Sequence, residues 1–182
     1  MATARPPATA LLIIDVQQGL CEGPDAAHAT SDLIRTLNAV AARCRAAGIP
    51  VIFIQHESTK GYLPHGSREW QLADGLQAEP GDRRIRKTTP DSFLRTELQA
   101  TLDALGVREL IIGGMHSEFC VDTTTRRALA LGYPVRLIED GHTSAGNAHL
   151  SPAQVIAHHN ATLSNIASFG PRARPVPGAQ LP

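Results

Sequence analysis

Three short segments of this chain share one pattern, in which a helical stretch ends at a glycine and a strand-like run follows. They are Ala47-Gly48-Ile49-Pro50, Leu105-Gly106-Val107 and Leu131-Gly132-Tyr133-Pro134. A glycine just past the last helical turn is a common stop signal, and a short apolar run after it is typical of a buried strand. Apolar strands that alternate with helices predict a parallel sheet covered on both faces. The expected fold class is a three-layer α/β/α sandwich with a mainly parallel, Rossmann-like sheet.

The remaining pattern predicts where each element lies. Strands are expected at residues 10–14, 51–54, 83–87, 109–113, 135–139 and 173–176. Helices are expected at residues 31–47, 94–105, 118–131 and 152 to about 168, the last of them opened by the capping box Ser151-Pro152-Ala153-Gln154. The polar, Gly- and Pro-rich stretch 56–82 is expected to be a surface excursion, either a lid or an interface. No linker divides the chain, so residues 1–182 form one domain, with loosely ordered tails at 1–8 and 177–182.

Composition narrows the class of partner. Lys plus Arg (17) balance Asp plus Glu (17), and this zero net charge favours neither nucleic acid nor an anionic membrane. No apolar run reaches the length of a membrane span, and Met1–Thr9 lacks the apolar core of a signal peptide. The cysteines Cys21, Cys44 and Cys120 match neither a disulfide framework nor a CxxC pattern. We therefore expect a cytoplasmic protein with a small-molecule partner.

Three chemically distinct side chains follow the ends of predicted strands. Asp15 ends the first strand, Lys87 ends the third, and Cys120 follows the fourth through Gly113-Gly114. Ligands of parallel sheets bind beyond the carboxyl ends of the strands, so these side chains are expected to converge at one edge. A thiol at the start of a helix also lies near the positive end of the helix dipole, which favours the thiolate.

The three residue types suit nucleophilic catalysis. A thiol needs activation, a carboxylate can take its proton, and a lysine keeps both charged groups oriented. Each residue also has a structural explanation: Asp15 as a strand-end cap, Lys87 as a solvated charge and Cys120 as a core cysteine. Taken together, those explanations require three coincidences at one edge, and catalysis is the better interpretation.

The chain resembles the isochorismatase-like cysteine hydrolases, which include nicotinamidases and N-carbamoylsarcosine amidases. The resemblance covers about residues 9–169 and is carried by LLIIDVQ, RKTTPDSF, GGMHSEFCVDTTTRRALALGYPV and EDGHTS. It implies that Asp15, Lys87 and Cys120 form the catalytic triad. It also implies a cis peptide between Met115 and His116, with the backbone N–H groups of His116 and Cys120 as the oxyanion hole. A homodimer or homotetramer is implied as well.

One departure from the family pattern concerns metal. Zinc-binding nicotinamidases carry an Asp-x-His pair after the second strand, whereas this chain has Gln55-His56-Glu57 there and His65 later. Two histidines in a long polar loop are more often solvated than metal-bound. We therefore expect no metal and no cofactor, and zinc at His56 and His65 is the rejected alternative.

Substrate contacts are predicted with less support. The candidates are Gln17, His56, Trp70, Phe119 and His142. Gln17 could instead bond nearby backbone, Trp70 could be a core residue, and Phe119 could pack at the helix start.

The sequence therefore predicts a cofactor-free cysteine hydrolase that cleaves an amide-type C–N bond of a small molecule through a thioacyl intermediate. An isochorismatase-type vinyl-ether hydrolase is the alternative within the family, although Cys120 favours amide chemistry. A thiol-based redox protein and a non-catalytic binding domain are rivals from other classes. The first lacks a nearby resolving cysteine, and the second leaves the filled triad positions unexplained.

Overall fold

The computed structural model describes residues 8–182, and its centre is a six-stranded sheet in the order β3-β2-β1-β4-β5-β6. Every neighbouring pair of strands is parallel. The strands are β1 (Ala8–Ile14), β2 (Val51–His56), β3 (Arg83–Lys87), β4 (Val107–Met115), β5 (Val135–Thr143) and β6 (Ala173–Val176). All six predicted strands are confirmed.

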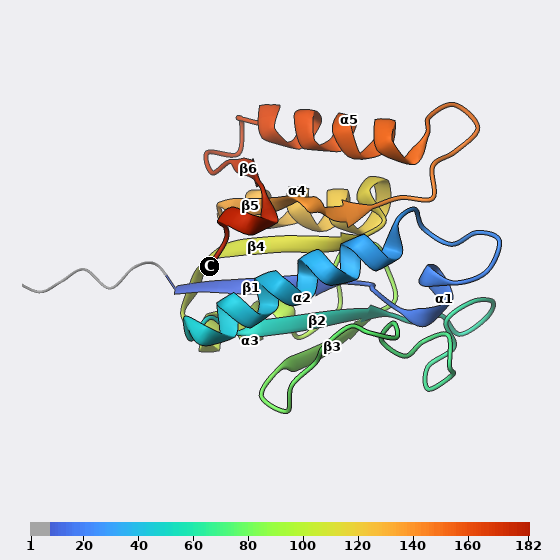
Figure 1. Ribbon diagram of the computed structural model, residues 1–182. Coiled ribbons are helices and arrows are strands. Elements are labelled where there is room, and N and C mark those ends of the chain that lie inside the picture. Colours follow the sequence, from blue (N-terminus) through green and yellow to red (C-terminus); the bar gives the residue numbers. More distant parts are fainter. Residues whose placement is uncertain (1–7) are drawn as a thin grey trace, which may run out of the picture.

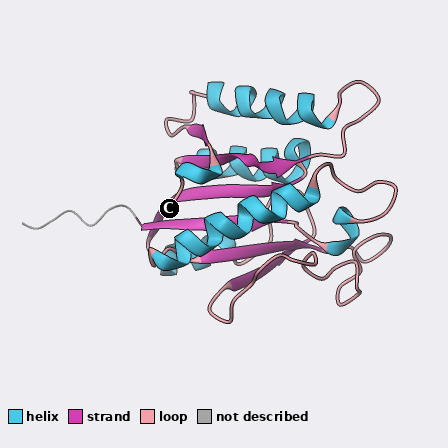
Figure 2. Cartoon of the chain, in the orientation of Figure 1, coloured by secondary structure: helices cyan, strands magenta, loops and turns pink. Residues whose placement is uncertain are grey.

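Helices lie on both faces of this sheet (Figures 1 and 2). They are α1 (Gln18–Cys21), α2 (Thr30–Ala46), α3 (Leu98–Ala104), α4 (Asp122–Ala130) and α5 (Pro152–Asn165), together with the π-helical turn η1 (Ser117–Val121) and the 3-10 turn η2 (Gly178–Gln180). Helix α2 packs on one face, while α3, α4 and α5 cover the other. The three-layer α/β/α class is therefore confirmed.

The central strand β1 shows why both faces must be covered. Leu11 and Ile13 pack in the core beneath α2, and Leu12 and Ile14 belong to the core on the opposite face. These four side chains are at most 1% exposed. An apolar run without alternation is what a strand buried on both faces requires.

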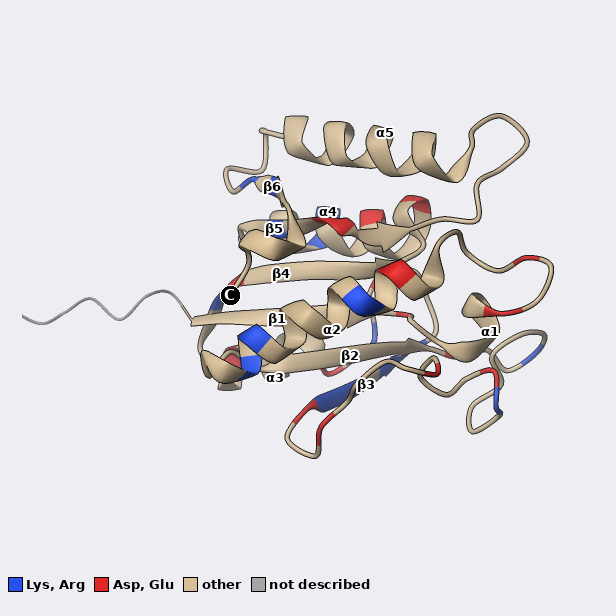
Figure 3. Ribbon diagram, viewed as in Figure 1, with Lys and Arg blue, Asp and Glu red and all other residues tan. Residues whose placement is uncertain are grey.

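The edge strand β3 is of a different kind. Its side chains at positions 83, 84 and 86 are exposed arginines, and only Ile85 and Lys87 are buried (Figure 3). Charged side chains on an edge strand discourage pairing with another chain. Lys87 is the exception, because it turns inward at the carboxyl end of the strand, where the other candidate residues lie.

The Gly113-Gly114 pair, at which the predicted strand 109–113 ended, lies inside β4 instead. A Cβ on Gly114, whose φ is +128°, would lie 2.0 Å from the carbonyl oxygen of Ile14 on β1. A Cβ on Gly113 would lie 2.6 Å from the carbonyl oxygen of Gly141 on β5. The glycines therefore let β4 approach both neighbouring strands closely, and β4 continues to Met115.

The structure describes only Ala8 of the first expected tail but all of the second, residues 177–182. Residues 1–7 of the first lie outside the described residues, but Ala8 belongs to β1, so the expectation is wrong there. The expectation of a loose tail at 177–182 is also wrong. Asp140 Oδ1 accepts from the N–H of Gly178, Arg43 donates to the carbonyl of Leu181, and the Leu181 side chain is buried under α2.

Other boundaries differ from expectation, among them the end of β2 at His56 rather than 54 and the end of α5 at Asn165 rather than about 168. Strand β5 runs on to Thr143, so His142 lies within it, and α3 begins at Leu98 rather than at 94. The region predicted as one helix from 118 is a π-helical turn followed by α4. In the part of the chain that the structure describes, no helix is both long and apolar enough to cross a membrane.

Candidate active site

The carboxyl edge of the sheet brings the three predicted residues together. Asp15 directly follows β1 with a left-handed φ of 54°, and Lys87 is the last residue of β3. Cys120 lies in η1, just beyond β4. A non-glycine residue with positive φ is uncommon and is often found at functional sites.

Lys87 is at the centre of this group. Its Nζ lies 2.6 Å from Asp15 Oδ2 and 3.2 Å from Cys120 Sγ, and it also donates to the carbonyl oxygen of Thr89 at 3.1 Å. The side chains of Lys87 and Asp15 are 0% and 2% exposed. Within residues 8–182, the second carboxylate oxygen of Asp15, Oδ1, has no hydrogen-bond partner. That oxygen is therefore available to accept a proton.

The charge states follow from burial and neighbours. Burial disfavours the charged form of Lys87, but the adjacent Asp15 and Cys120 outweigh it and raise the pKa of this lysine above its ordinary value. Burial, reinforced by the charge of Asp15, raises the pKa of the Cys120 thiol to about 12. The expectation that this position favours a thiolate is therefore wrong for the resting protein. The thiol keeps its proton at neutral pH and lies beside a carboxylate.

His56 is the predicted contact that lies against this group. Its Nδ1 is 3.4 Å from Lys87 Nζ, and its ring stacks on Tyr62 with ring centroids 6.1 Å apart. Burial, and then the charge of Lys87, lowers the pKa of His56, so its ring is neutral at pH 7. Tyr62 is 61% exposed and was not predicted, since nothing in a polar excursion marks one tyrosine as near the site.

The turn before Cys120 has the unusual backbone that the family resemblance implied. The peptide bond between Met115 and His116 is cis. The carbonyl oxygen of His116 accepts from the N–H groups of Phe119 and Val121. Within residues 8–182, the N–H of His116 itself is paired with no acceptor.

Gln17 is not placed to contact a substrate. Its amide is fully buried, with Nε2 donating to the carbonyl oxygens of His56 and Trp70, and Oε1 accepting from the N–H of His56. The predicted substrate contact is therefore wrong. Through these hydrogen bonds, Gln17 instead holds the segment 56–82 against the end of β1.

His142 is also not a substrate contact, because it is 3% exposed and both ring nitrogens have protein partners. It belongs to β5 and contacts Ser117 and Asn160 instead. Neither partner was predicted from the sequence, since each is a common polar residue in a helical pattern.

The two remaining predicted contacts are aromatic and stay predictions. Phe119, beside Cys120, is 57% exposed, and its ring meets His116 edge to face at 6.3 Å. It is therefore not packed in the core. Trp70 is half-buried, its ring meets His65 edge to face at 4.7 Å, and its Nε1 is buried without a partner among the described residues.

The residues do not fit a zinc ion. His56 Nδ1 faces the Lys87 ammonium, and His65 Nε2 lies 2.7 Å from Arg86 Nη1, so each ring already faces a cationic side chain. Over the described part of the chain, no three His, Cys, Asp or Glu side chains gather as metal ligands.

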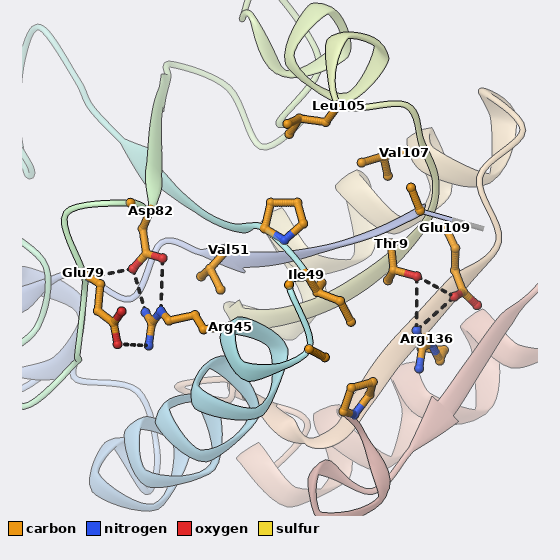
Figure 4. Close-up of a pocket in the computed structure, with 16 residues that line it drawn as sticks. Thr9, Arg45, Ile49, Val51, Glu79, Asp82, Leu105, Val107, Glu109 and Arg136 are labelled. Carbon is orange, nitrogen blue, oxygen red and sulfur yellow. Dashed lines mark hydrogen bonds and ion pairs between the residues drawn. The ribbon is translucent and has the colours of Figure 1, made fainter. Parts of the chain in front are cut away.

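A cavity of about 930 Å³ lies at the opposite, amino edge of the sheet (Figure 4). Its apolar wall includes Val51 and Val107, and its charges are already paired. Arg45 forms an ion pair with Asp82 at one end of the cavity, and Arg136 forms one with Glu109 at the other end. Neither cysteine nor histidine lines this cavity, so the groups for nucleophilic chemistry lie at the other edge.

The comparisons with known proteins show the family to which the chain belongs. Residues 9–168 match the model of the isochorismatase domain, so the chain belongs to the isochorismatase family. A crystal structure described as an isochorismatase family protein superposes with a TM-score of 0.85 at 36% identity, covering 93% of this chain and 98% of that one.

Two curated relatives extend the comparison. A streptothricin hydrolase of Streptomyces noursei is 40% identical over 74% of this chain and 49% of its own length. Nicotinamidase 3 of Arabidopsis thaliana is 32% identical over 88% of this chain and 81% of its own. The chain spans about half the length of the streptothricin hydrolases that it matches.

Proposed function

We propose that this protein is a cysteine hydrolase that cleaves an amide-type C–N bond of a small molecule. Cys120 is the nucleophile, Asp15 the general base and then acid, and Lys87 their electrostatic partner. The observation that carries the proposal is the buried contact of Lys87 Nζ with both Asp15 Oδ2 and Cys120 Sγ. The names of the family relatives, a streptothricin hydrolase and a nicotinamidase, support the same class of chemistry.

The first half of the reaction forms a thioester. Asp15 takes the thiol proton as the sulfur of Cys120 attacks the carbonyl carbon, and the carbonyl oxygen becomes an oxyanion. The backbone N–H groups of His116 and Cys120 stabilise that charge, an interaction worth several kcal/mol in a dry site. The C–N bond then breaks as Asp15 gives its proton to the leaving nitrogen, which departs as ammonia or an amine.

The second half regenerates the thiol. A water molecule gives a proton to Asp15 and attacks the thioester carbon, forming a second oxyanion. The C–S bond breaks, the acid is released, and the sulfur recovers its proton from Asp15. Lys87 stays charged throughout, because its pKa is raised, and it keeps the carboxylate and the sulfur oriented.

A protonated resting thiol suits this scheme. Because the pKa of Cys120 is raised to about 12, the thiolate appears only as its proton moves to Asp15. A thiol-based redox protein would require an ionised sulfur, since the thiolate is the species that reacts with peroxide. Vinyl-ether hydrolysis remains the alternative within the family, and it does not require the sulfur.

The cytoplasmic setting, the absence of a cofactor and a homodimeric or homotetrameric state remain predictions. Size-exclusion chromatography with light scattering measures the oligomeric state directly.

Ammonia or amine release from a panel of small amides, lactams and ureido compounds tests the proposed function. Cys120→Ala is the blank, and Cys44→Ala is the matched control, because Cys44 is a fully buried residue of α2, away from the carboxyl edge of the sheet. We expect turnover in the wild type and in the Cys44 variant, and none with Cys120→Ala. Turnover that survives in Cys120→Ala would contradict the proposal. Trapping the thioester by mass spectrometry identifies the intermediate.

A further inference from the structure

The end of β5 holds the turn that carries the nucleophile. After a shift of register between β4 and β5, Gly114 pairs with His142 and Met115 with Thr143. The segment beyond β4 is held by side chains from this region: Ser117 Oγ lies 2.7 Å from His142 Nδ1. The β5 end therefore contacts the first residue of η1 directly.

A second contact joins the same two segments. The Oγ of Ser144, just past β5, donates to Glu118 Oε1 at 2.6 Å and accepts from the N–H of Gly146. Two consecutive residues of η1, Ser117 and Glu118, are thus held by two side chains that lie two positions apart.

His142 has no polar atom left for solvent or substrate. Its Nδ1 meets Ser117, and its Nε2 lies 3.0 Å from Asn160 Oδ1 on α5. Burial lowers the pKa of His142, so the ring is neutral at pH 7 and carries one N–H.

The contacts of Asn160 fix where that proton is. Asn160 Nδ2 donates to the carbonyl oxygen of Glu139 at 3.0 Å, so its Oδ1 is the atom that faces His142 as an acceptor. The hydrogen is therefore on His142 Nε2, and Nδ1 has the free lone pair. Ser117 must then donate its hydroxyl hydrogen to Nδ1. The chain of hydrogen bonds runs in one direction, from Ser117 through His142 and Asn160 to Glu139.

This chain ends beside the N–H groups that the proposed reaction uses. Ser117 directly follows His116 and lies three residues before Cys120. The position of its side chain constrains the peptide planes on either side, because the backbone and Cβ of a residue move together. Fixing Ser117 from β5 and α5 therefore restricts how η1 can rotate.

We propose that His142 is a positioning residue whose hydrogen bond to Ser117 holds the N–H groups of His116 and Cys120 in the direction of the developing oxyanion. The inference rests on the proposed function and adds to it a role for β5 and α5. His142 does not touch the substrate. It acts through Ser117 alone.

The role predicts a specific kinetic signature. The oxyanion exists only in the transition state and the intermediates, so misaligned N–H groups lower kcat and leave KM nearly unchanged. Removing one oxyanion donor costs about 10²–10³-fold in kcat, and a misplacement of about 1 Å costs about 10²-fold. We expect Ser117→Ala to lower kcat by about 10- to 100-fold, with KM within about twofold.

The test compares the wild type with four variants on an amide that the wild type turns over. Ser117→Ala removes the hydroxyl, and Ser117→Thr retains it. The matched control is Ser92→Ala, which removes a fully buried hydroxyl whose partner is Thr124 on α4. We expect the kcat loss in Ser117→Ala only, with recovery in Ser117→Thr. His142→Gln, whose amide can both donate and accept, is expected to fall between wild type and Ser117→Ala.

A second readout works without amide turnover. Benzaldehyde adds to the Cys120 thiol to give a hemithioacetal: the C–S bond forms, the π bond of the C=O group breaks, and the S–H proton passes to Asp15 or to the former carbonyl oxygen. Its affinity is measured by protection of Cys120 from alkylation. We expect Ser117→Ala to weaken that affinity by at least about tenfold and Ser92→Ala to leave it unchanged. If the wild type binds benzaldehyde but hydrolyses no amide, the proposed function fails, and the aldehyde affinities of Ser117→Ala and Ser92→Ala decide the positioning role.

Two results would overturn the positioning role. The first is a Ser117→Ala protein that keeps both kcat and aldehyde affinity within about twofold of wild type. The second is an equal loss in Ser117→Ala and Ser92→Ala, because that would mean a general effect of deleting a buried hydroxyl. Thermal unfolding of each variant shows that the proteins compared are folded.

Discussion

Each edge of the sheet has an ion pair between a basic and an acidic side chain, but the two pairs differ in how deeply they are buried. At the amino edge, Arg136 pairs with Glu109 at 2.9 Å, and each side chain is 25% exposed (Figure 4). At the carboxyl edge, Lys87 pairs with Asp15 at 2.6 Å, and both side chains are almost completely buried. The cavity of about 930 Å³ lies at the amino edge, whereas the Cys120 thiol lies at the carboxyl edge.

The difference teaches that the size of a cavity is a poor guide to chemistry in this fold. Every charge named at the amino edge has a partner that neutralises it. At the carboxyl edge, Asp15 Oδ1 is buried without a partner in the described chain, and as an acceptor it can take a proton, which the equally unpartnered Nε–H of Arg136 at the amino edge cannot. A buried acceptor that lacks a donor costs about 1–3 kcal/mol, so the fold retains a group that is ready to take a proton at the expense of stability.

The largest expected effect is on turnover. Asp15→Asn keeps the shape of the side chain but removes the proposed base, and we expect kcat/KM for amide hydrolysis to fall by about 10³-fold or more. Asp82→Asn, at the amino edge, is expected to change kcat/KM by less than about twofold. Steady-state ammonia release measures both. Equal losses of kcat/KM in the two variants would contradict the assignment of the reaction to the carboxyl edge.

The next effect is on stability. Lys87→Met leaves the Asp15 carboxylate buried without a counter-charge, which costs about 3–5 kcal/mol. Arg136→Met at the amino edge removes a partly exposed pair and is expected to cost about 0–1 kcal/mol. Urea unfolding at pH 7 gives both values.

A double variant sharpens this prediction. Adding Asp15→Asn to Lys87→Met removes the unpaired charge and should restore part of the lost stability. No recovery in the double variant would mean that the lysine contributes through packing rather than charge.

A smaller effect concerns acid stability. Burial lowers the pKa of His142 below its ordinary value of 6.5, and the same holds for His116 and His56. The unfolded chain therefore binds more protons than the folded one below about pH 6.5, so stability falls as the pH falls through that value. Unfolding free energies between pH 8 and pH 5 test this. His142→Gln removes one of these groups, so the slope should become shallower; an unchanged slope would count against a neutral, buried His142.

The smallest expected effect is on the reactivity of Cys120 toward alkylation, which should rise in the variant that loses turnover. The negative charge of Asp15 contributes to the raised pKa of Cys120, so Asp15→Asn should increase the thiolate fraction. We expect iodoacetamide to alkylate Cys120 faster in Asp15→Asn than in wild type at pH 8, while turnover falls. Peptide mass spectrometry distinguishes Cys120 from Cys21 and from buried Cys44. A slower alkylation would indicate a preformed thiolate that depends on the aspartate.

Much of the fold was predictable because its signals are local. The apolar runs marked β1, β2, β4 and β5, with helix-end glycines before the last three, and the capping box at Ser151 marked the start of α5. Boundaries were missed where a neighbouring strand decides them. Strand β4 passes through Gly113-Gly114, and β5 reaches Thr143, because pairing across the sheet continues beyond the apolar residues.

By itself, the sequence determined which residue types follow each strand, and parallel strands bring those positions to one edge whatever the details of packing. That is why Asp15, Lys87 and Cys120 could be grouped before any coordinates. Only the tertiary structure decided their states: a protonated thiol, a fully enclosed lysine, a buried Gln17 and a His142 that faces Ser117. Burial and neighbouring charge set these properties, and both depend on residues distant in the chain that no local pattern encodes.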